Sequence, residues 1–205
     1  MGCFITMEGP DGSGKTTQIQ LLRDYLPGKG YDIIVCREPG GTKISEAIRQ
    51  VILNKEFTEM GNMTELLLYA AARAQLMEEV IRPALKEHKI VICDRFVESS
   101  AVYQGIARGM GVDLIYEVNQ YAIGDTLPDL TVMIDIDAET GISRKKKQAE
   151  LDRMERETID FHKKVVSGYR EIAGKYPERM LRIDGRASIQ EIHEQITAAV
   201  DKIIS

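Results

Sequence analysis

Short apolar runs alternate with amphipathic stretches along this chain, and the runs have the length of β-strands. We predict strands at residues 4–7, 33–36, 90–93, 130–136 and 180–183. Their apolar residues are mostly consecutive and often β-branched, which is typical of strands buried on both faces of a parallel sheet.

Helical periodicity fills the segments between these strands. A long helix is predicted from about residue 64 to residue 86, and the last helix carries an apolar stripe made of Ile189, Ile192, Ile196, Val200 and Ile203. Ser188 is placed to cap that last helix, and Glu191 completes a capping box. Five strands joined by helical crossovers predict one doubly wound α/β domain over residues 1–205, a five-stranded parallel sheet with helices on both faces in three layers.

Composition and charge exclude several classes of protein. The 205 residues include 27 Lys and Arg against 32 Asp and Glu, and this net charge of −5 argues against a nucleic-acid binder. The longest unbroken apolar run is Leu66–Ala72, far short of the roughly 18 residues of a membrane helix. The cysteines, Cys3, Cys36 and Cys93, have no metal-binding spacing. We expect a cytoplasmic protein with core cysteines, no nucleic-acid partner and no membrane partner.

A phosphate-binding loop follows the first predicted strand and opens a helix. The match to G-x-x-x-x-G-K-[ST] comprises Gly9, Pro10, Asp11, Gly12, Ser13, Gly14, Lys15 and Thr16, and Thr17 follows it. Such a loop directs backbone N–H groups at phosphate oxygens, and the helix dipole adds to the attraction. We expect Lys15 to reach the β- and γ-phosphates of ATP and the Thr16 hydroxyl to bind Mg²⁺.

The third strand ends in Asp94, which predicts a Walker B motif, whose carboxylate lies near the metal at the carboxyl edge of the sheet. A GTPase is excluded, because the Asn-Lys sequence at Asn54 is not followed by the required Asp. A small domain with a charged, mobile segment at about residues 141–157 fits a small-molecule kinase whose lid excludes water.

Arginines mark the place where a phosphate acceptor would bind. Arg37, with Glu38 and Pro39 after it, follows the second strand, and Arg95 follows the third. Tyr69 and Arg73 lie four residues apart on one face of a helix, where they can stack on and hydrogen-bond a flat base. Packing in the core is the alternative reading of Tyr69.

At this point the chain resembles bacterial thymidylate kinase over nearly its whole length. The motifs that carry the resemblance are residues 9–17, 37–42, 69–73, 94–96 with 103–105, 127–131 and 150–155. The resemblance implies the reaction ATP + dTMP → ADP + dTDP with Mg²⁺, in the synthesis of dTTP, by a cytoplasmic homodimer.

The resemblance also implies roles for individual residues. Lys15 and the loop amides would hold the donor phosphates, Asp11 the acceptor 3′-hydroxyl, and Arg95 with Arg37 the acceptor phosphate. Tyr69 would stack on thymine and Arg73 would read the edge of the base. Ser100, Tyr103 and Gln104 would line the acceptor pocket, and Tyr103 would crowd a ribose 2′-hydroxyl. Arg144 would pack on adenine, beside the loop at Gly185.

The chain departs from the family in ways that leave one role open. Gly12 stands where one branch of the family has a catalytic arginine, and the lid contributes mostly lysines. Arg153 and Lys147 are the candidates for stabilising the transferring phosphoryl group, and an arginine at position 12 is expected to replace part of that charge. Phe96 replaces a commoner tyrosine.

Two alternatives stay open at this point. One is another P-loop nucleotide or deoxynucleoside kinase, which a panel of acceptors would distinguish. The other is an ATP-dependent switch protein, which would hydrolyse ATP without any acceptor.

Overall fold

Five parallel strands form the central sheet, as the sequence predicts. The computed structural model describes residues 2–146 and 152–204, and of Lys146 only the backbone. The strands are β1 (Cys3–Glu8), β2 (Ile33–Arg37), β3 (Ile90–Asp94), β4 (Leu130–Asp135) and β5 (Met180–Asp184). Their order in the sheet is β2-β3-β1-β4-β5, and every pair is parallel. Each observed strand begins and ends within one residue of its prediction.

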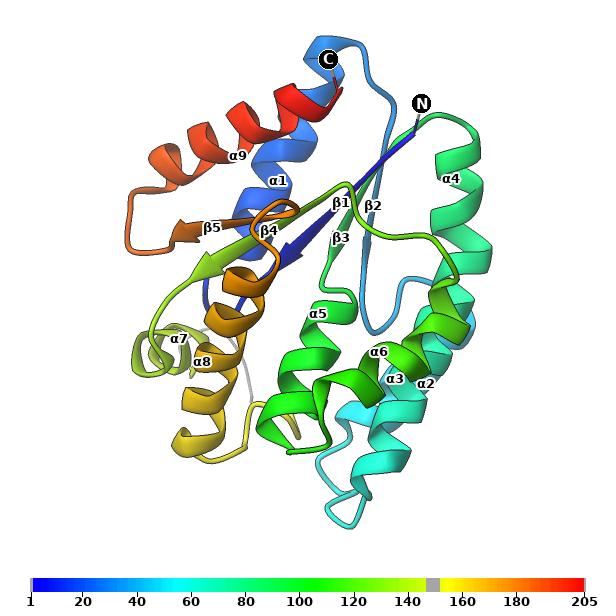
Figure 1. Cartoon of the computed structure of the whole chain (residues 1–205), viewed down its shortest axis with the longest axis vertical. Coiled ribbons are helices and arrows are strands. Elements are labelled where there is room, and N and C mark those ends of the chain that lie inside the picture. The colour runs from blue at the N-terminus through cyan, green and yellow to red at the C-terminus, as the bar shows by residue number, and fades with distance from the viewer. Residues whose placement is uncertain (1, 147–151, 205) are drawn as a thin grey trace.

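Helices cover both faces of this sheet (Figure 1). They are α1 (Lys15–Tyr25), α2 (Lys43–Leu53), α3 (Asn62–Leu76), α4 (Arg82–Lys86), α5 (Val97–Ser100), α6 (Val112–Ile123), α7 (Ala138–Lys146), α8 (Ile159–Lys175) and α9 (Ile189–Ile204). Shorter turns are a 3₁₀ turn (Leu26–Lys29) and two π-helical stretches (Met77–Ile81 and Ala101–Ala107). The long helix predicted over 64–86 corresponds to α3, the first π-helical stretch and α4.

Side-chain alternation along β1 divides the core into two layers. Cys3, Ile5 and Met7 pack on one face with apolar residues of α1 and α9, whereas Phe4 packs on the other face with residues of α3, α4 and α6. A third cluster joins α3, α6 and α8 and includes Met133 of β4 and Met180 of β5. The predicted three-layer α/β/α arrangement is confirmed.

Local capping also follows the sequence. The backbone N–H of Ser188 donates to the Glu191 carboxylate, and the Glu191 N–H donates back to the Ser188 hydroxyl, which is the capping box predicted for α9. The three cysteines are buried and free. In the part of the chain that the structure describes, no helix is long and apolar enough to cross a membrane.

The register of the strands brings polar residues to one edge of the sheet. Asp94 pairs with Met7 on one side and with Arg37 on the other, so that Glu8, Arg37 and Asp94 end neighbouring strands together. Ligands bind at this carboxyl edge in open α/β sheets.

Candidate active site

The phosphate loop lies between β1 and α1 and needs glycine at two tight places. Gly9 has φ 135°, and a Cβ atom there would collide with the backbone carbonyl of Ile134 on β4. Gly12 has φ 74°, and its backbone lies against that of Gly141 on α7. The loop therefore fits between two other segments only because these positions lack side chains.

Lys15 is held inside this loop. Its ammonium donates to the carbonyl oxygens of Gly9 and Pro10 at 2.9 and 3.1 Å, and the residue is 7% exposed. Burial, with the charge of Arg95 adding to it, lowers the pKa of Lys15 to about 8. A nearby anion would stabilise the charged form of Lys15 against this burial and repulsion, so the site favours a phosphate group beside Lys15.

Asp94 supplies an unsatisfied acceptor next to the loop. Its Oδ1 is buried and has no hydrogen-bond partner among the described residues. Asp94 and Thr16 both line the same cavity, of about 500 Å³. A buried carboxylate oxygen and a hydroxyl so placed suit a hard cation such as Mg²⁺.

The cavity has two halves, one at the phosphate loop and one lined by Tyr69, Arg73 and Tyr103, and Arg95 lies between them. Its guanidinium donates to the Asp11 carboxylate at 2.7 Å and to the Gly9 carbonyl at 3.2 Å. It also lies 5.3 Å from the ring centroid of Tyr103. Burial would raise the pKa of Asp11, but the charges of Arg95, Lys15 and Lys145 hold it well below its usual range. An arginine in this position can contact anions in both halves.

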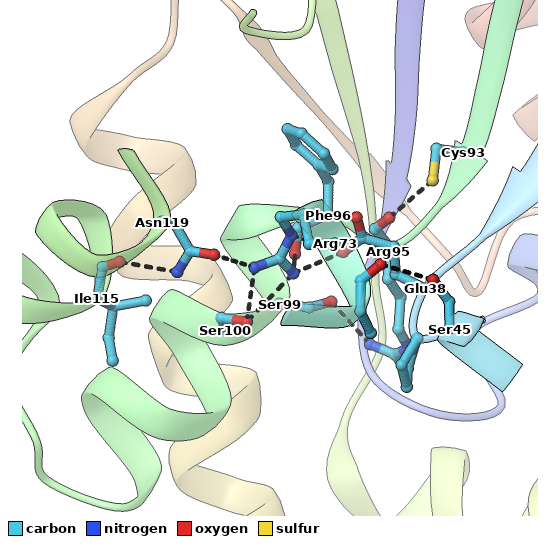
Figure 2. A network of polar contacts seen from close by, with 12 residues as sticks. Glu38, Ser45, Arg73, Cys93, Arg95, Phe96, Ser99, Ser100, Ile115 and Asn119 are labelled. Atoms are coloured by element: carbon cyan, nitrogen blue, oxygen red, sulfur yellow. Dashed lines mark hydrogen bonds and ion pairs between the residues drawn. The ribbon is translucent and has the colours of Figure 1, made fainter. Parts of the chain in front are cut away.

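Arg73 forms the floor of the second half and is tied down on several sides (Figure 2). It is 1% exposed, and it donates to Glu38 at 2.7 Å, to Ser100, to the Phe96 carbonyl at 3.0 Å and to Asn119. Burial raises the pKa of Glu38, and the neighbouring Arg73 opposes that shift. Because the network joins α3, α5 and α6, it holds the guanidinium in one position.

Aromatic and amide side chains complete this half. The Tyr103 hydroxyl donates to Asp11 at 3.2 Å, and the Gln104 amide donates to Glu65 at 2.8 Å. Tyr69 lines the cavity from α3. It is partly buried, and the cavity is one of its surroundings.

Most residues predicted from the sequence line this one cavity. They are Asp11, Gly12, Ser13, Gly14, Lys15, Thr16, Thr17, Arg37, Glu38, Pro39, Tyr69, Arg73, Asp94, Arg95, Ser100, Tyr103, Gln104, Arg144 and Gly185. Gly9 and Pro10 lie beside it and hold Lys15. The cavity thus extends from the phosphate loop to Tyr69 and Arg73.

Comparison with known proteins identifies a family with this arrangement. The family model described as thymidylate kinase matches residues 7–196. This chain belongs to the thymidylate kinase family. It is 49% identical to the thymidylate kinase of Geobacillus sp. (strain WCH70), over 97% of this chain and 96% of that one. It is also 49% identical to that of Thermoanaerobacter sp. (strain X514), over 99% of each.

A solved structure agrees with the fold. The crystal structure of thymidylate kinase from Ehrlichia chaffeensis superposes with a TM-score of 0.79 at 34% identity, and 98% of each chain is covered. The predicted resemblance to the thymidylate kinase family and the predicted fold class are both confirmed.

Arg153, one of the two candidates for stabilising the transferring phosphoryl group, makes its contacts with residues that do not line the cavity. Its guanidinium donates to the Ile52 carbonyl at 2.7 Å and pairs with Glu65 at 2.7 Å. It is not among the residues that line the cavity. The ion pair with Glu65 holds the Arg153 guanidinium against α3. Lys147, the other candidate, lies outside the described residues.

Lys145 takes the position at the cavity instead. Its ammonium pairs with Glu155 at 2.9 Å, and both line the cavity with Asp152. Burial lowers the pKa of Lys145, but Glu155 and Asp11 together hold it above its usual value. The sequence indicates this residue only as one member of a basic run.

Arg49 and Ser99 are cavity residues that the sequence does not single out. Arg49 reaches the cavity from α2, where it donates to the Pro39 carbonyl at 2.9 Å. Ser99 lies beside Arg95 at 3.1 Å. Neither belongs to a recognisable motif, and only the packing of α2 and α5 brings them to the site.

Proposed function

We propose that this chain transfers the γ-phosphoryl group of ATP to dTMP and so forms ADP and dTDP for dTTP synthesis. The observation that carries the proposal is the position of Arg95. It contacts the phosphate loop through Asp11 and Gly9 and faces the pocket that ends at Tyr69 and Arg73. In this proposal, the Arg95 guanidinium lies between the donor phosphates at the loop and the acceptor nucleotide near Tyr69 and Arg73.

In this proposal the loop amides and Lys15 hold the donor phosphates, and Arg144 with the loop at Gly185 borders adenine. The Arg144 guanidinium lies 3.4 Å from the Gly12 carbonyl, which supports its place beside the donor site. Thr16 and Asp94 would hold Mg²⁺, which neutralises charge on the phosphate oxygens when bound. Among residues 2–146 and 152–204, no cluster of three or more His, Cys, Asp or Glu side chains is placed for a metal.

The acceptor side uses Arg95 with Arg37 for the phosphate, Asp11 and Tyr103 near the sugar, and Tyr69 for stacking on thymine. Arg73, Ser100 and Gln104 would define the edge of the base. No side-chain nucleophile is required, because the second pKa of a phosphate monoester is about 6 and the attacking oxygen is already ionised at neutral pH. The residues overcome repulsion between two anions and hold them in line.

A lid over residues 141–157 is part of the proposal, with residues 147–151 outside the described structure. Lys145 is the described lid cation best placed for the transferring phosphoryl group, since it lines the cavity whereas Arg153 pairs with Glu65. This lid and both substrate sites would belong to one domain.

We also propose a homodimer in the cytoplasm. Exposed apolar residues follow one side of α2 and one side of α3, two helices that pack together. They are Ile44 (53% exposed), Val51 (39%), Met63 (47%) and Leu67 (52%). Light scattering measures the molar mass in solution. We expect the wild type to be a dimer and Leu67→Lys to be a monomer.

An acceptor panel tests the function itself. With ATP held constant, ADP formation is measured with dTMP, dUMP, dCMP and dGMP. We expect dTMP to exceed dCMP, because a pocket that pairs with a 4-oxo group leaves buried polar groups unpaired when it meets a 4-amino group, at about 1–3 kcal/mol. Equal rates with dTMP and dCMP would contradict the assignment, and ADP formation with no acceptor would favour the switch-protein alternative.

A further inference from the structure

Glu8, the last residue of β1, is a fully buried carboxylate outside the cavity. Its Oε1 accepts from the backbone N–H groups of Phe96 at 2.7 Å and Ser99 at 3.3 Å. Its Oε2 accepts from the hydroxyls of Ser99 at 2.6 Å and Tyr169 at 2.9 Å. Glu8 is 0% exposed and is not a lining residue, so it does not touch a substrate.

The same two hydroxyls face Arg95 on their other side. The Nη1 atom of Arg95 donates to Ser99 Oγ and to Tyr169 OH, both at 3.1 Å, and Figure 2 shows the contact with Ser99. A hydroxyl has a single hydrogen. The two hydroxyls also lie 2.9 Å from each other, so each can donate either to Glu8 or to its neighbour. When both donate to Glu8, their lone pairs are left to accept from the guanidinium. The carboxylate therefore favours the arrangement in which both hydroxyls accept the hydrogen bonds that Arg95 donates.

Glu8 also stabilises an unusual backbone conformation at Arg95. Arg95 has φ 72°, which is left-handed and costly for a residue with a side chain. Immediately after it, the Phe96 N–H is held by Glu8, while the N–H of Arg95 donates to the Met7 carbonyl at 3.0 Å. The last two residues of β1 thus hold both sides of this strained position.

We infer that Glu8 is a positioning residue. Through Ser99, Tyr169 and the backbone after Arg95, it orients the Arg95 guanidinium that would bind the acceptor phosphate. This inference rests on the proposed function, in which Arg95 binds the phosphate of dTMP. It assigns to a buried acid beside the phosphate loop a role in recognising the phosphate group but not the nucleoside.

Glu8→Gln isolates that role because the amide keeps the size of the side chain. If its nitrogen faces Ser99 and Tyr169, both hydroxyls must accept, and their hydrogens turn toward the Arg95 guanidinium. If its nitrogen faces Phe96 instead, it opposes a backbone N–H. Either orientation places donor against donor, so Arg95 loses its position.

The readout compares two ligands by calorimetry in the full-length protein. Thymidine shares the base and sugar of dTMP but lacks the phosphate. In Glu8→Gln we expect dTMP binding to weaken about 10-fold or more, the effect of losing one charged hydrogen bond. Thymidine binding should change much less, so the affinity ratio of the two ligands falls. A purely structural role would weaken both ligands equally and leave the ratio unchanged, which would overturn the inference.

Glu98→Gln is the matched control. Glu98 is also a buried acid next to Ser99, but its carboxylate pairs with Arg179 at 2.5 Å. This variant should lower stability without changing the affinity ratio. A fall as large as that of Glu8→Gln would contradict a specific role for Glu8.

A second variant keeps the question answerable if Glu8→Gln does not fold. Ser99→Ala with Tyr169→Phe removes both hydroxyl bridges and retains the carboxylate and its backbone contacts. The same fall in the ratio is expected, and an unchanged ratio overturns the inference. If the wild type binds dTMP no better than thymidine, the phosphate role of Arg95 fails instead, and with it the proposed function.

Discussion

Gly12 of the phosphate loop and Gly141 of α7 lie in direct backbone contact. A Cβ atom added to Gly141 would be 2.5 Å from the Asp11 carbonyl oxygen and 3.3 Å from Ile136 Cδ1. Asp137 fixes the start of α7 by accepting from the Thr140 N–H at 2.7 Å. The first turn of the lid segment therefore rests on the loop that would hold the donor phosphates, without any side chain between them.

This contact predicts that Gly141→Ala lowers kcat. The added methyl group must lift α7 from the loop, and a displacement near 1 Å costs about 10²-fold in rate when it misplaces reacting groups. Gly174→Ala is the control, because that glycine also lies in a helix and nothing approaches its Cβ position. It should retain full activity and gain about 0.5–1 kcal/mol in stability. Equal kcat values for the two variants would contradict the prediction.

The same geometry reverses an expectation from the sequence about position 12. Gly12 has a positive φ, and a Cβ atom there would lie under 3.0 Å from the Gly141 carbonyl. An arginine at this position would displace α7 rather than supply charge. We therefore expect Gly12→Arg to lower activity in the wild type and to give no rescue of lid variants.

Substitutions of lid residues should separate Lys145 from Arg153. Lys145→Met is expected to lower kcat at least about 10-fold, since an arginine in this role contributes about 10³–10⁵ and a lysine less. Arg153→Gln should mainly lower thermal stability, because it breaks the buried contact with Glu65. Lys163→Met, which removes an exposed lysine paired with Glu139, is the control and should change neither. A larger kcat loss in Arg153→Gln than in Lys145→Met would restore the assignment made from the sequence.

The difference between these two residues illustrates what the sequence could and could not predict. Strands such as β1 were predicted within one residue, because burial on both faces makes them continuously apolar. The phosphate loop and the Tyr69–Arg73 pair are local motifs, so their place at the cavity was also predictable. The partner of Arg153 is Glu65, which lies far away in the sequence. Glu8 was not recognised, because its four contacts come from residues 88 or more positions later. Non-local ion pairs of this kind have no sequence pattern.

Lys15 predicts a pH dependence of ATP binding. Burial lowers its pKa to about 8, so the free enzyme loses this positive charge as the pH rises above 8. ATP affinity should then fall about 10-fold per pH unit. From pH 8 to the ordinary lysine pKa of 10.5, the unfolded chain binds more protons at this residue than the folded chain, so its contribution to stability should rise over that range. Calorimetric titration with ATP from pH 7 to 9.5 measures the affinity. Lys15→Arg keeps its charge and should bind more weakly but without this dependence; a flat wild-type profile would contradict the prediction.

Arg73 predicts a large loss of stability on truncation. Arg73→Ala leaves Glu38 buried without its cationic partner, which costs about 3–5 kcal/mol. Arg23→Ala removes an exposed arginine paired with Asp24 and should cost about 0–1 kcal/mol. Urea denaturation compares the free energies of unfolding. A loss for Arg73→Ala as small as that for Arg23→Ala would show that the buried network does not hold the pocket.

The destination of the γ-phosphoryl group of ATP tests the central claim most directly. With γ-labelled ATP and dTMP, we expect the label to appear in dTDP, with little inorganic phosphate released when dTMP is omitted. Lys15→Ala should reduce transfer by about 10²-fold or more, as for other groups that stabilise charge in a transition state. Label that appears in inorganic phosphate whether or not dTMP is present, or near wild-type transfer by Lys15→Ala, would contradict the account.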